Sequence, residues 1–235
     1  TGGDTVTMTW LGETTSSANP NGYLIGTGIF TAALAALVIA QIVAKKFHPL
    51  LYWVTIIAST TAGTTLADFA DRSLGIGYTG GSAALFACVM LSLGVWYFAE
   101  GSVSVNTVST PRVEIFYWIT ITFSQTLGTA LGDWIADTSG LGYQGGALLF
   151  SGAIALIALL YAVTKLSRVA LFWAAFILTR PLGATVGDFL DKPFDHGGLA
   201  LSRPIATAVL GAVILVLILV IPQRAGTHPG NEKTI

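Results

Sequence analysis

Three aspartates occupy the same place in three similar stretches of this sequence, near the end of a long apolar run. They are Asp68, Asp133 and Asp188. A carboxylate at such a place is costly in lipid unless it is paired, or faces protein or water. Carboxylates within membranes bind cations, relay protons or join helices by hydrogen bonds. The chemistry these residues offer is therefore ion or solute binding, or helix packing.

Polar residues at helical spacing precede each of these aspartates. Residues i and i+4 lie on one face of a helix. Three such faces follow from the sequence: Thr60, Thr64 and Asp68; Gln125, Thr129 and Asp133; and Arg180, Ala184 and Asp188. A face that carries threonine, glutamine or arginine does not point at lipid, so we expect all three to point into a helix bundle.

The composition predicts that the helices carrying these faces cross a membrane. Apolar residues make up 53% of the chain and charged residues 10%, whereas soluble domains carry about 25% charged residues. The mean hydropathy is +0.73. Apolar windows of about 20 residues predict an all-α, polytopic transmembrane bundle with seven spans: 22–44, 50–70, 82–99, 113–136, 145–165, 168–190 and 203–222. The links between them are short, so residues 1–235 are predicted to form a single membrane domain.

An internal repeat relates the three faces to one another. Trp53, Trp118 and Trp173 each precede one of the aspartates by fifteen residues, and Gly63, Gly128 and Gly183 precede them by five. Each unit continues through a glycine-rich link into a more uniformly apolar segment. We interpret the chain as tandem two-helix units at 1–45 (partial), 46–105, 106–165 and 166–222, followed by a tail at 223–235. Close helix packing explains the recurring glycines.

The first residues fit the same pattern. TGGD at 1–4 aligns with TLAD at 65–68, which places Asp4 in register with the three later aspartates. We interpret the first unit as lacking its tryptophan helix, so the full protein is expected to have eight spans. Each unit has an even number of helices, so the units run in one orientation. Pseudo-symmetry about the membrane normal would then bring four aspartates around one axis.

These features resemble a group of bacterial membrane proteins built from four tandem repeats of unknown function. Each repeat of that group has two transmembrane segments and a characteristic tryptophan, which here would be Trp53, Trp118 or Trp173. The resemblance covers essentially the whole chain and is weakest in the first unit. It implies the architecture and supplies no catalytic residues.

The basic residues predict an orientation in the membrane. Seven of the eleven lysines and arginines fall on one side of the predicted spans: Lys45, Lys46, Arg112, Lys165, Arg168, Arg224 and Lys233. The positive-inside rule makes this side cytoplasmic, which predicts a cytoplasmic C-terminus in a bacterial inner membrane. If the tryptophans lie in the cytoplasmic aromatic belt, the aspartates lie about 22 Å further along each helix. They would then be near the outer boundary of the hydrocarbon core.

Arg180 lies two turns inside its predicted span, where the other units have Thr60 and Gln125. An arginine in the hydrocarbon core costs at least ~2.5 kcal/mol on insertion scales. We therefore expect it to meet a carboxylate of another unit, with Asp133 or Asp68 the best candidates. Two interpretations stay open: a buried pair that locks the bundle, or a group that contacts a solute or forms part of a gate.

Several classes of protein are disfavoured. The net charge of −1 provides no basic surface for nucleic acid, and the lone Cys88 excludes disulfides and cysteine-based metal sites. Every lysine lies in a link or a tail, which excludes a retinal pigment. No predicted span holds a histidine that could form a nucleophile–base pair, so neither an enzyme nor a cofactor is expected. The histidines lack metal-ligand spacing, and whether the aspartates hold a metal is unknown.

Two functions remain. The first is a transporter of a cation or small solute, with a site drawn from the inward-facing residues Asp4, Asp68, Asp133, Asp188, Arg180, Gln125, Thr129 and Thr64. The second is a structural or accessory subunit of a larger membrane complex, in which the aspartates serve helix–helix hydrogen bonding or folding. A second acid follows in each unit and is expected to be solvated: Asp71, Asp137 and Asp191. The expected partners are the lipid bilayer and either a homo-oligomer or a larger complex.

Overall fold

The computed structural model describes residues 20–44, 47–68, 77–105, 108, 110–138 and 140–221, and this part of the chain is helical, as predicted. The long helices are α2 (Pro20–Val43), α3 (Pro49–Asp68), α4 (Gly77–Glu100), α5 (Pro111–Asp133), α6 (Gly142–Val163), α7 (Arg168–Asp191) and α8 (Arg203–Val220). A π-helical turn, η4 (Trp134–Thr138), follows α5, and a 3-10 turn, η5 (Phe194–His196), follows α7. Asp4, Asp71 and the tail at 223–235 lie outside the described residues.

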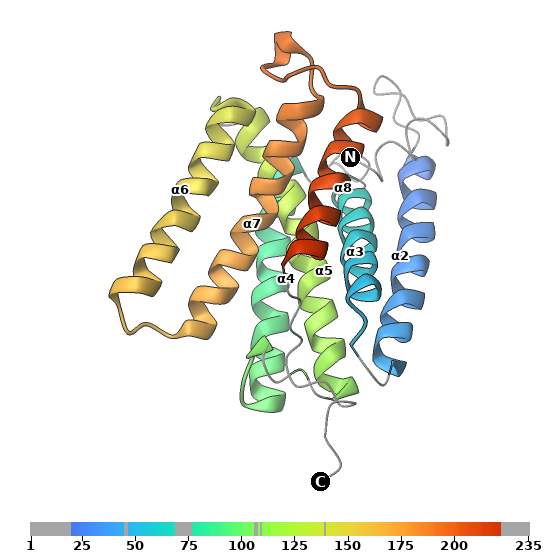
Figure 1. Ribbon diagram of the computed structural model, residues 1–235, viewed down its shortest axis with the longest axis vertical. Helices are drawn as coiled ribbons and strands as arrows, with labels where there is room; N and C mark the ends of the chain where they lie inside the picture. The colour runs from blue at the N-terminus through green and yellow to red at the C-terminus, as the bar shows by residue number, and fades with distance from the viewer. Residues whose placement is uncertain are drawn as a thin grey trace.

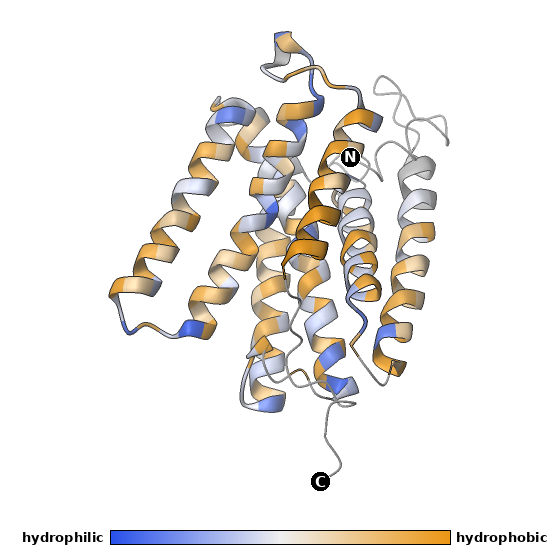
Figure 2. Ribbon diagram, in the orientation of Figure 1, coloured by the Kyte–Doolittle hydropathy of each residue, from blue (hydrophilic) through white to orange (hydrophobic). Residues whose placement is uncertain are grey.

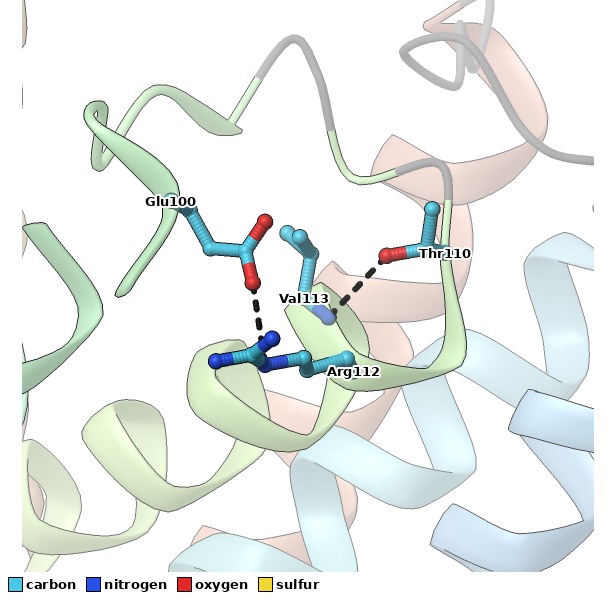
Figure 3. A network of polar contacts seen from close by, with 4 residues as sticks. All are labelled: Glu100, Thr110, Arg112 and Val113. Atoms are coloured by element: carbon cyan, nitrogen blue, oxygen red, sulfur yellow. Dashed lines mark hydrogen bonds and ion pairs between the residues drawn. The ribbon is translucent and has the colours of Figure 1, made fainter.

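The link between α4 and α5 shows how the sequence sets the helix ends (Figure 3). Gly101 ends α4 with a φ of +72°, a left-handed conformation that glycine adopts without strain. Thr110 then caps α5, since its Oγ1 accepts a hydrogen bond from the backbone N–H of Val113 at 3.3 Å. Arg112 donates from Nε to Glu100 across the link at 3.1 Å. These local contacts join α4 and α5 as antiparallel neighbours.

The tryptophan-bearing helices α3, α5 and α7 form the middle of the bundle (Figure 1). Helix α5 packs against α3 on one side and α7 on the other, while α2 packs on α3, α4 on α5 and α6 on α7. Helices α2 and α6 lie at opposite edges of the view. Each tryptophan-bearing helix therefore packs against the apolar helix that precedes it in the chain. Since the apolar helix belongs to the preceding sequence unit, each of these contacts joins two successive units.

A long helix lies at each of the seven predicted spans. Five of these described helices are long and apolar enough to cross a membrane: α2 over Gly26–Val43, α3, α4, α6 and α7. The apolar stretch of α8, Pro204–Val220, is shorter. Helix α5 has the length of a span but a more polar composition, because it is enclosed by α3, α4 and α7 and meets protein along most of its length. Its polar side chains therefore need not face lipid.

The bundle has an apolar exterior and a partly polar interior. Large apolar side chains are exposed on the outside, among them Phe98, Leu148 and Leu219, and α2, α6 and α8 are mostly hydrophobic in colour (Figure 2). Buried positions of α3 and α5 include threonines and serines. Several of their hydroxyls bond within the helix; for example, Thr55 Oγ1 donates to the carbonyl of Leu51 at 2.7 Å. This distribution is that of a protein embedded in lipid.

The repeat tryptophans are packed against protein rather than standing free on its surface. Trp118 and Trp173 are 3% and 4% exposed, and Trp53 is half-buried. Trp173 packs edge-on against Trp96, and its Nε1 donates to the carbonyl of Val103 at 2.9 Å. Burying both the ring and its N–H anchors α7 to α4 and the link that follows it.

The π-helical turn after Asp133 has a cause in the sequence. The two acids at the end of this helix, Asp133 and Asp137, are four residues apart, whereas Asp188 and Asp191 are three apart. One additional residue in a continuous helix is accommodated as a π-turn, and η4 spans Trp134–Thr138. The extra residue thus widens the helix immediately after Asp133.

Candidate solute-binding cavity

The three polar faces surround one cavity of about 460 Å³ between α3, α5, α7 and α8. All nine residues of these faces line it: Thr60, Thr64, Asp68, Gln125, Thr129, Asp133, Arg180, Ala184 and Asp188. Seven of the eight residues predicted for the site are therefore in one place, and the eighth, Asp4, lies outside the described residues. The volume lies within the range of small-molecule sites, about 300–1,000 Å³.

Equivalent residues of two units meet beside the cavity. The hydroxyls of Thr64 and Thr129, which are sixty-five positions apart, lie 3.3 Å from each other. Tyr52 and Tyr117 have the same separation in sequence, and their hydroxyls form a hydrogen bond of 2.8 Å. Helices α3 and α5 therefore contact each other through equivalent residues at two positions along their axes. These two contacts fix how far one helix is shifted along its axis relative to the other.

The repeat glycines determine how closely these helices approach. A Cβ added at Gly63 would lie 3.1 Å from the Cβ of Gln125, and one added at Gly128 would lie 2.2 Å from the Cβ of Arg180. Gln125 and Arg180 are equivalent positions, so each glycine packs against the same position of the next unit. Gly183 differs, because no atom of the described residues lies within 4 Å of its Cβ position and it borders the cavity. Within the described part of the chain no helix packs against Gly183, which leaves room for the cavity.

The carboxylates differ in exposure. Asp68 is 4% exposed, whereas Asp133 and Asp188 are half-buried. Each of the three takes part in a polar or electrostatic interaction within the structure. Asp191 also lines the cavity, although the sequence predicted only a solvated role for it. The acidic groups therefore belong to an ordered polar lining.

Arg180 does not pair with Asp133 or Asp68, contrary to the prediction. Among the residues described, no carboxylate lies within ion-pair distance of it, and its guanidinium lies over the ring of Phe176, 4.2 Å from the centroid. Long side chains on a helix point toward its N-terminus, which brings the Arg180 guanidinium to Phe176, one turn earlier, and away from Asp188.

Two buried N–H groups of the lining lack a hydrogen-bond acceptor in the described part of the chain. They are Nε2 of Gln125, a residue that is 4% exposed, and Nε of Arg180. Buried donors are nearly always satisfied in folded proteins. These two occupy equivalent repeat positions on neighbouring helices, and both side chains line the cavity.

Sequence reasoning missed the wall contributed by α8. Ala206, Thr207, Leu210, Gly211 and Ile214 line the cavity from this helix. Helix α8 is largely apolar, so its sequence shows no series of polar residues at i, i+4 spacing that would predict an inward face. The small residues Ala206, Thr207 and Gly211 recur four or five apart, and this spacing is the signal that could have indicated an inward face.

A second cavity, of about 670 Å³, lies between α4 and α7 and has a different character. Its lining includes Phe86, Met90, Leu93 and Ile177, and it has no charged side chain. No group of three or more metal-ligating side chains occurs among residues 20–44, 47–68, 77–105, 108, 110–138 and 140–221. The polar cavity is therefore the better candidate for a functional site.

The apolar exterior, the long helices and the repeated tryptophan–glycine–aspartate pattern define an integral membrane protein built from tandem two-helix repeats. A family model described as Repeat of Unknown Function (DUF347) matches three segments, residues 51–102, 116–167 and 171–224. Each match begins two residues before one of the repeat tryptophans. These matches cover more than half of the chain, so it belongs to this repeat family, which confirms the resemblance inferred from the sequence.

Neither the curated proteins nor the solved structures contain a match to this chain.

Proposed function

We propose that this protein is a transporter of a small solute or cation and that the polar cavity is its binding site. The observation that carries the proposal is the lining of this cavity by nine residues that come from the same face of three repeats. Within a bundle whose exterior is apolar, such a cavity provides a polar environment for a hydrophilic solute. Intramembrane ionisable groups mark solute and ion paths in many membrane proteins.

The repeats are consistent with this proposal. Many transporters are built from internal repeats, with the solute site at the repeat interface near the middle of the membrane. Here the cavity lies where α3, α5 and α7 converge, and α8 supplies an apolar wall. We propose a bacterial inner-membrane location with the link at 164–167 and the C-terminus in the cytoplasm, in accordance with the positive-inside rule.

A structural or accessory subunit is the second candidate. The observation that favours it is the pairing of polar groups between helices, since the Tyr52–Tyr117 and Thr64–Thr129 contacts join α3 to α5. Hydrogen bonds of this kind stabilise helix packing in membranes. On this alternative the carboxylates serve only assembly, and their neutralisation would lower stability without affecting any flux.

Flux through proteoliposomes separates the two candidates. Purified protein is reconstituted, and uptake of a panel of labelled cations and small solutes is compared between the wild type and Asp133→Asn. The matched control is Asp195→Asn, which makes the same change at an exposed residue of η5. We expect uptake of at least one solute to fall with Asp133→Asn and to persist with Asp195→Asn. Wild-type uptake no greater than that of protein-free liposomes would favour the accessory-subunit candidate. Equal uptake by all three proteins would show transport that does not use Asp133 and would contradict the proposed site.

A further inference from the structure

Two donors in the cavity lining point to the kind of ligand that it holds. Gln125 and Arg180 occupy the same repeat position on α5 and α7, and Gly128 brings the two helices into close contact beside them. Nε2 of Gln125 and Nε of Arg180 are both buried and have no acceptor in the described part of the chain. A buried donor without an acceptor costs free energy, so an acceptor that enters the cavity would be bound favourably.

The charge of Arg180 narrows the chemistry of that acceptor. No carboxylate of the described residues pairs with its guanidinium, which is held on the ring of Phe176 instead. The hydroxyls of Tyr52 and Tyr117 bond to each other, and as neutral phenols they do not offset the charge of Arg180. A guanidinium has five N–H donors in a planar fork that matches the two oxygens of a carboxylate. The positive charge is therefore free to pair with an anion.

We propose that Arg180 and Gln125 form an oxyanion subsite and that the solute of this protein carries a carboxylate. The carboxylate accepts hydrogen bonds from the Arg180 guanidinium and from Nε2 of Gln125 at the α5–α7 contact. This inference deepens the proposed function and rests on it in taking the bound species as the transported one. It also narrows the expected solute from a cation or small solute to a solute that carries a carboxylate.

The distribution of charge along the cavity supports such a solute. Asp188 lies eight residues after Arg180 on α7, which is about 12 Å along the helix axis. Asp68 and Asp133 occupy the repeat positions equivalent to Asp188 and also line the cavity. The cavity is therefore basic at the level of Arg180, and it carries several carboxylates together with Lys192 at the level of Asp188. A small carboxylate at Arg180, accompanied by a cation near the aspartates, matches both levels.

Binding of simple carboxylates to the purified protein tests the subsite without requiring transport. The protein is placed in nanodiscs of zwitterionic phosphatidylcholine, and succinate, acetate and inorganic phosphate are titrated calorimetrically. We expect succinate or acetate to bind more tightly than phosphate. Since hydrogen bonds to charged groups contribute about 1.5–3 kcal/mol, Arg180→Gln should weaken binding by at least about tenfold.

Two further variants and one control keep the test decisive if Arg180→Gln does not fold. Gln125→Glu has nearly the same shape and places a negative charge against the carboxylate, so it should weaken binding by about tenfold or more. Arg180→Lys keeps the charge but loses the planar fork, so it should bind more weakly than the wild type and more tightly than Arg180→Gln. Arg112→Gln removes the same charge from an exposed side chain and should bind like the wild type.

Each of the remaining outcomes overturns the inference. Binding of phosphate alone would contradict the assignment of a carboxylate. If nanodiscs with anionic phosphatidylglycerol abolish succinate binding, the oxyanion is a lipid headgroup rather than a soluble solute. Two further results would mean that water satisfies these donors: no binding of any probe, or binding that is unchanged by substitution of Arg180 and of Gln125.

The same experiments separate this inference from the proposed function. Arg180-dependent succinate binding without any flux in proteoliposomes would leave the subsite standing and refute transport. Asp133-dependent flux of a cation without binding of any carboxylate would leave transport standing and refute the subsite.

Discussion

Substitution of the three repeat glycines by alanine should have very different effects on stability. The Cβ added by Gly128→Ala would lie 2.2 Å from the Cβ of Arg180 and 2.9 Å from its carbonyl carbon, whereas ordinary contacts are 3.4–4 Å. Because backbone as well as side-chain atoms are in the way, α5 and α7 must separate by more than an ångström. Overpacking of this kind costs about 1–3 kcal/mol, occasionally more.

Gly183→Ala provides the matched control, because the same substitution at the equivalent position of α7 meets no atom of the described residues within 4 Å. Alanine is a better helix former than glycine by about 1 kcal/mol, so this variant should be as stable as the wild type or slightly more stable. Gly63→Ala, with contacts at 3.0–3.1 Å, should fall between the two. The gain in helix propensity is common to both variants, so the predicted difference between the variants at 128 and 183 is the overpacking cost of about 1–3 kcal/mol.

The assay is the free energy of unfolding in mixed detergent micelles, measured for the wild type and the three variants under identical conditions. The expected order of stability is Gly183→Ala, then Gly63→Ala, then Gly128→Ala. Equal destabilisation at 128 and 183 would refute the reasoning, since it would mean that another helix or a second copy of the chain packs against Gly183. A neutral Gly128→Ala would refute the described contact between α5 and α7.

Three further predictions follow from particular contacts. Trp173→Phe removes the hydrogen bond to Val103 and part of a buried ring, so it should lower the free energy of unfolding by about 1–3 kcal/mol; an unchanged value would contradict the buried position. A double-mutant cycle of Tyr52→Phe and Tyr117→Phe should give a coupling of about 1 kcal/mol for the 2.8 Å hydroxyl pair, and additive effects would contradict that pair. In a Cys88→Ser background, an impermeant maleimide should label Thr164→Cys only in inside-out vesicles and Ser202→Cys only in right-side-out vesicles. The reverse pattern would invert the proposed orientation.

Much of the fold followed from the repeat. The fifteen-residue spacing from tryptophan to aspartate predicted three equivalent helices, and these are α3, α5 and α7. The polar i, i+4 faces predicted which sides point inward, because such faces are costly in lipid. The structure places all three faces around one cavity, while their role in binding remains a proposal.

Other features depended on information that periodicity and hydropathy do not hold. Hydropathy treats every span as facing lipid, but α5 is enclosed by other helices and can carry polar residues without that cost. The prediction that Arg180 pairs with a carboxylate considered the charge alone. It ignored the direction of a long side chain on a helix, which brings the guanidinium to Phe176 at i−4. The lining contributed by α8 has no polar signature and emerged only from the packing.

The central claim is that the space beside Gly183 is a water-accessible cavity inside a lipid-embedded bundle. Labelling of a single cysteine tests it most directly, with Gly183→Cys and Leu148→Cys compared in a Cys88→Ser background. Leu148 is 75% exposed on the apolar exterior, where lipid would exclude a charged, water-soluble thiol reagent. We predict that Gly183→Cys reacts readily and that Leu148→Cys does not. If Gly183→Cys is as unreactive as Leu148→Cys, the cavity is closed to water and the proposed site is contradicted.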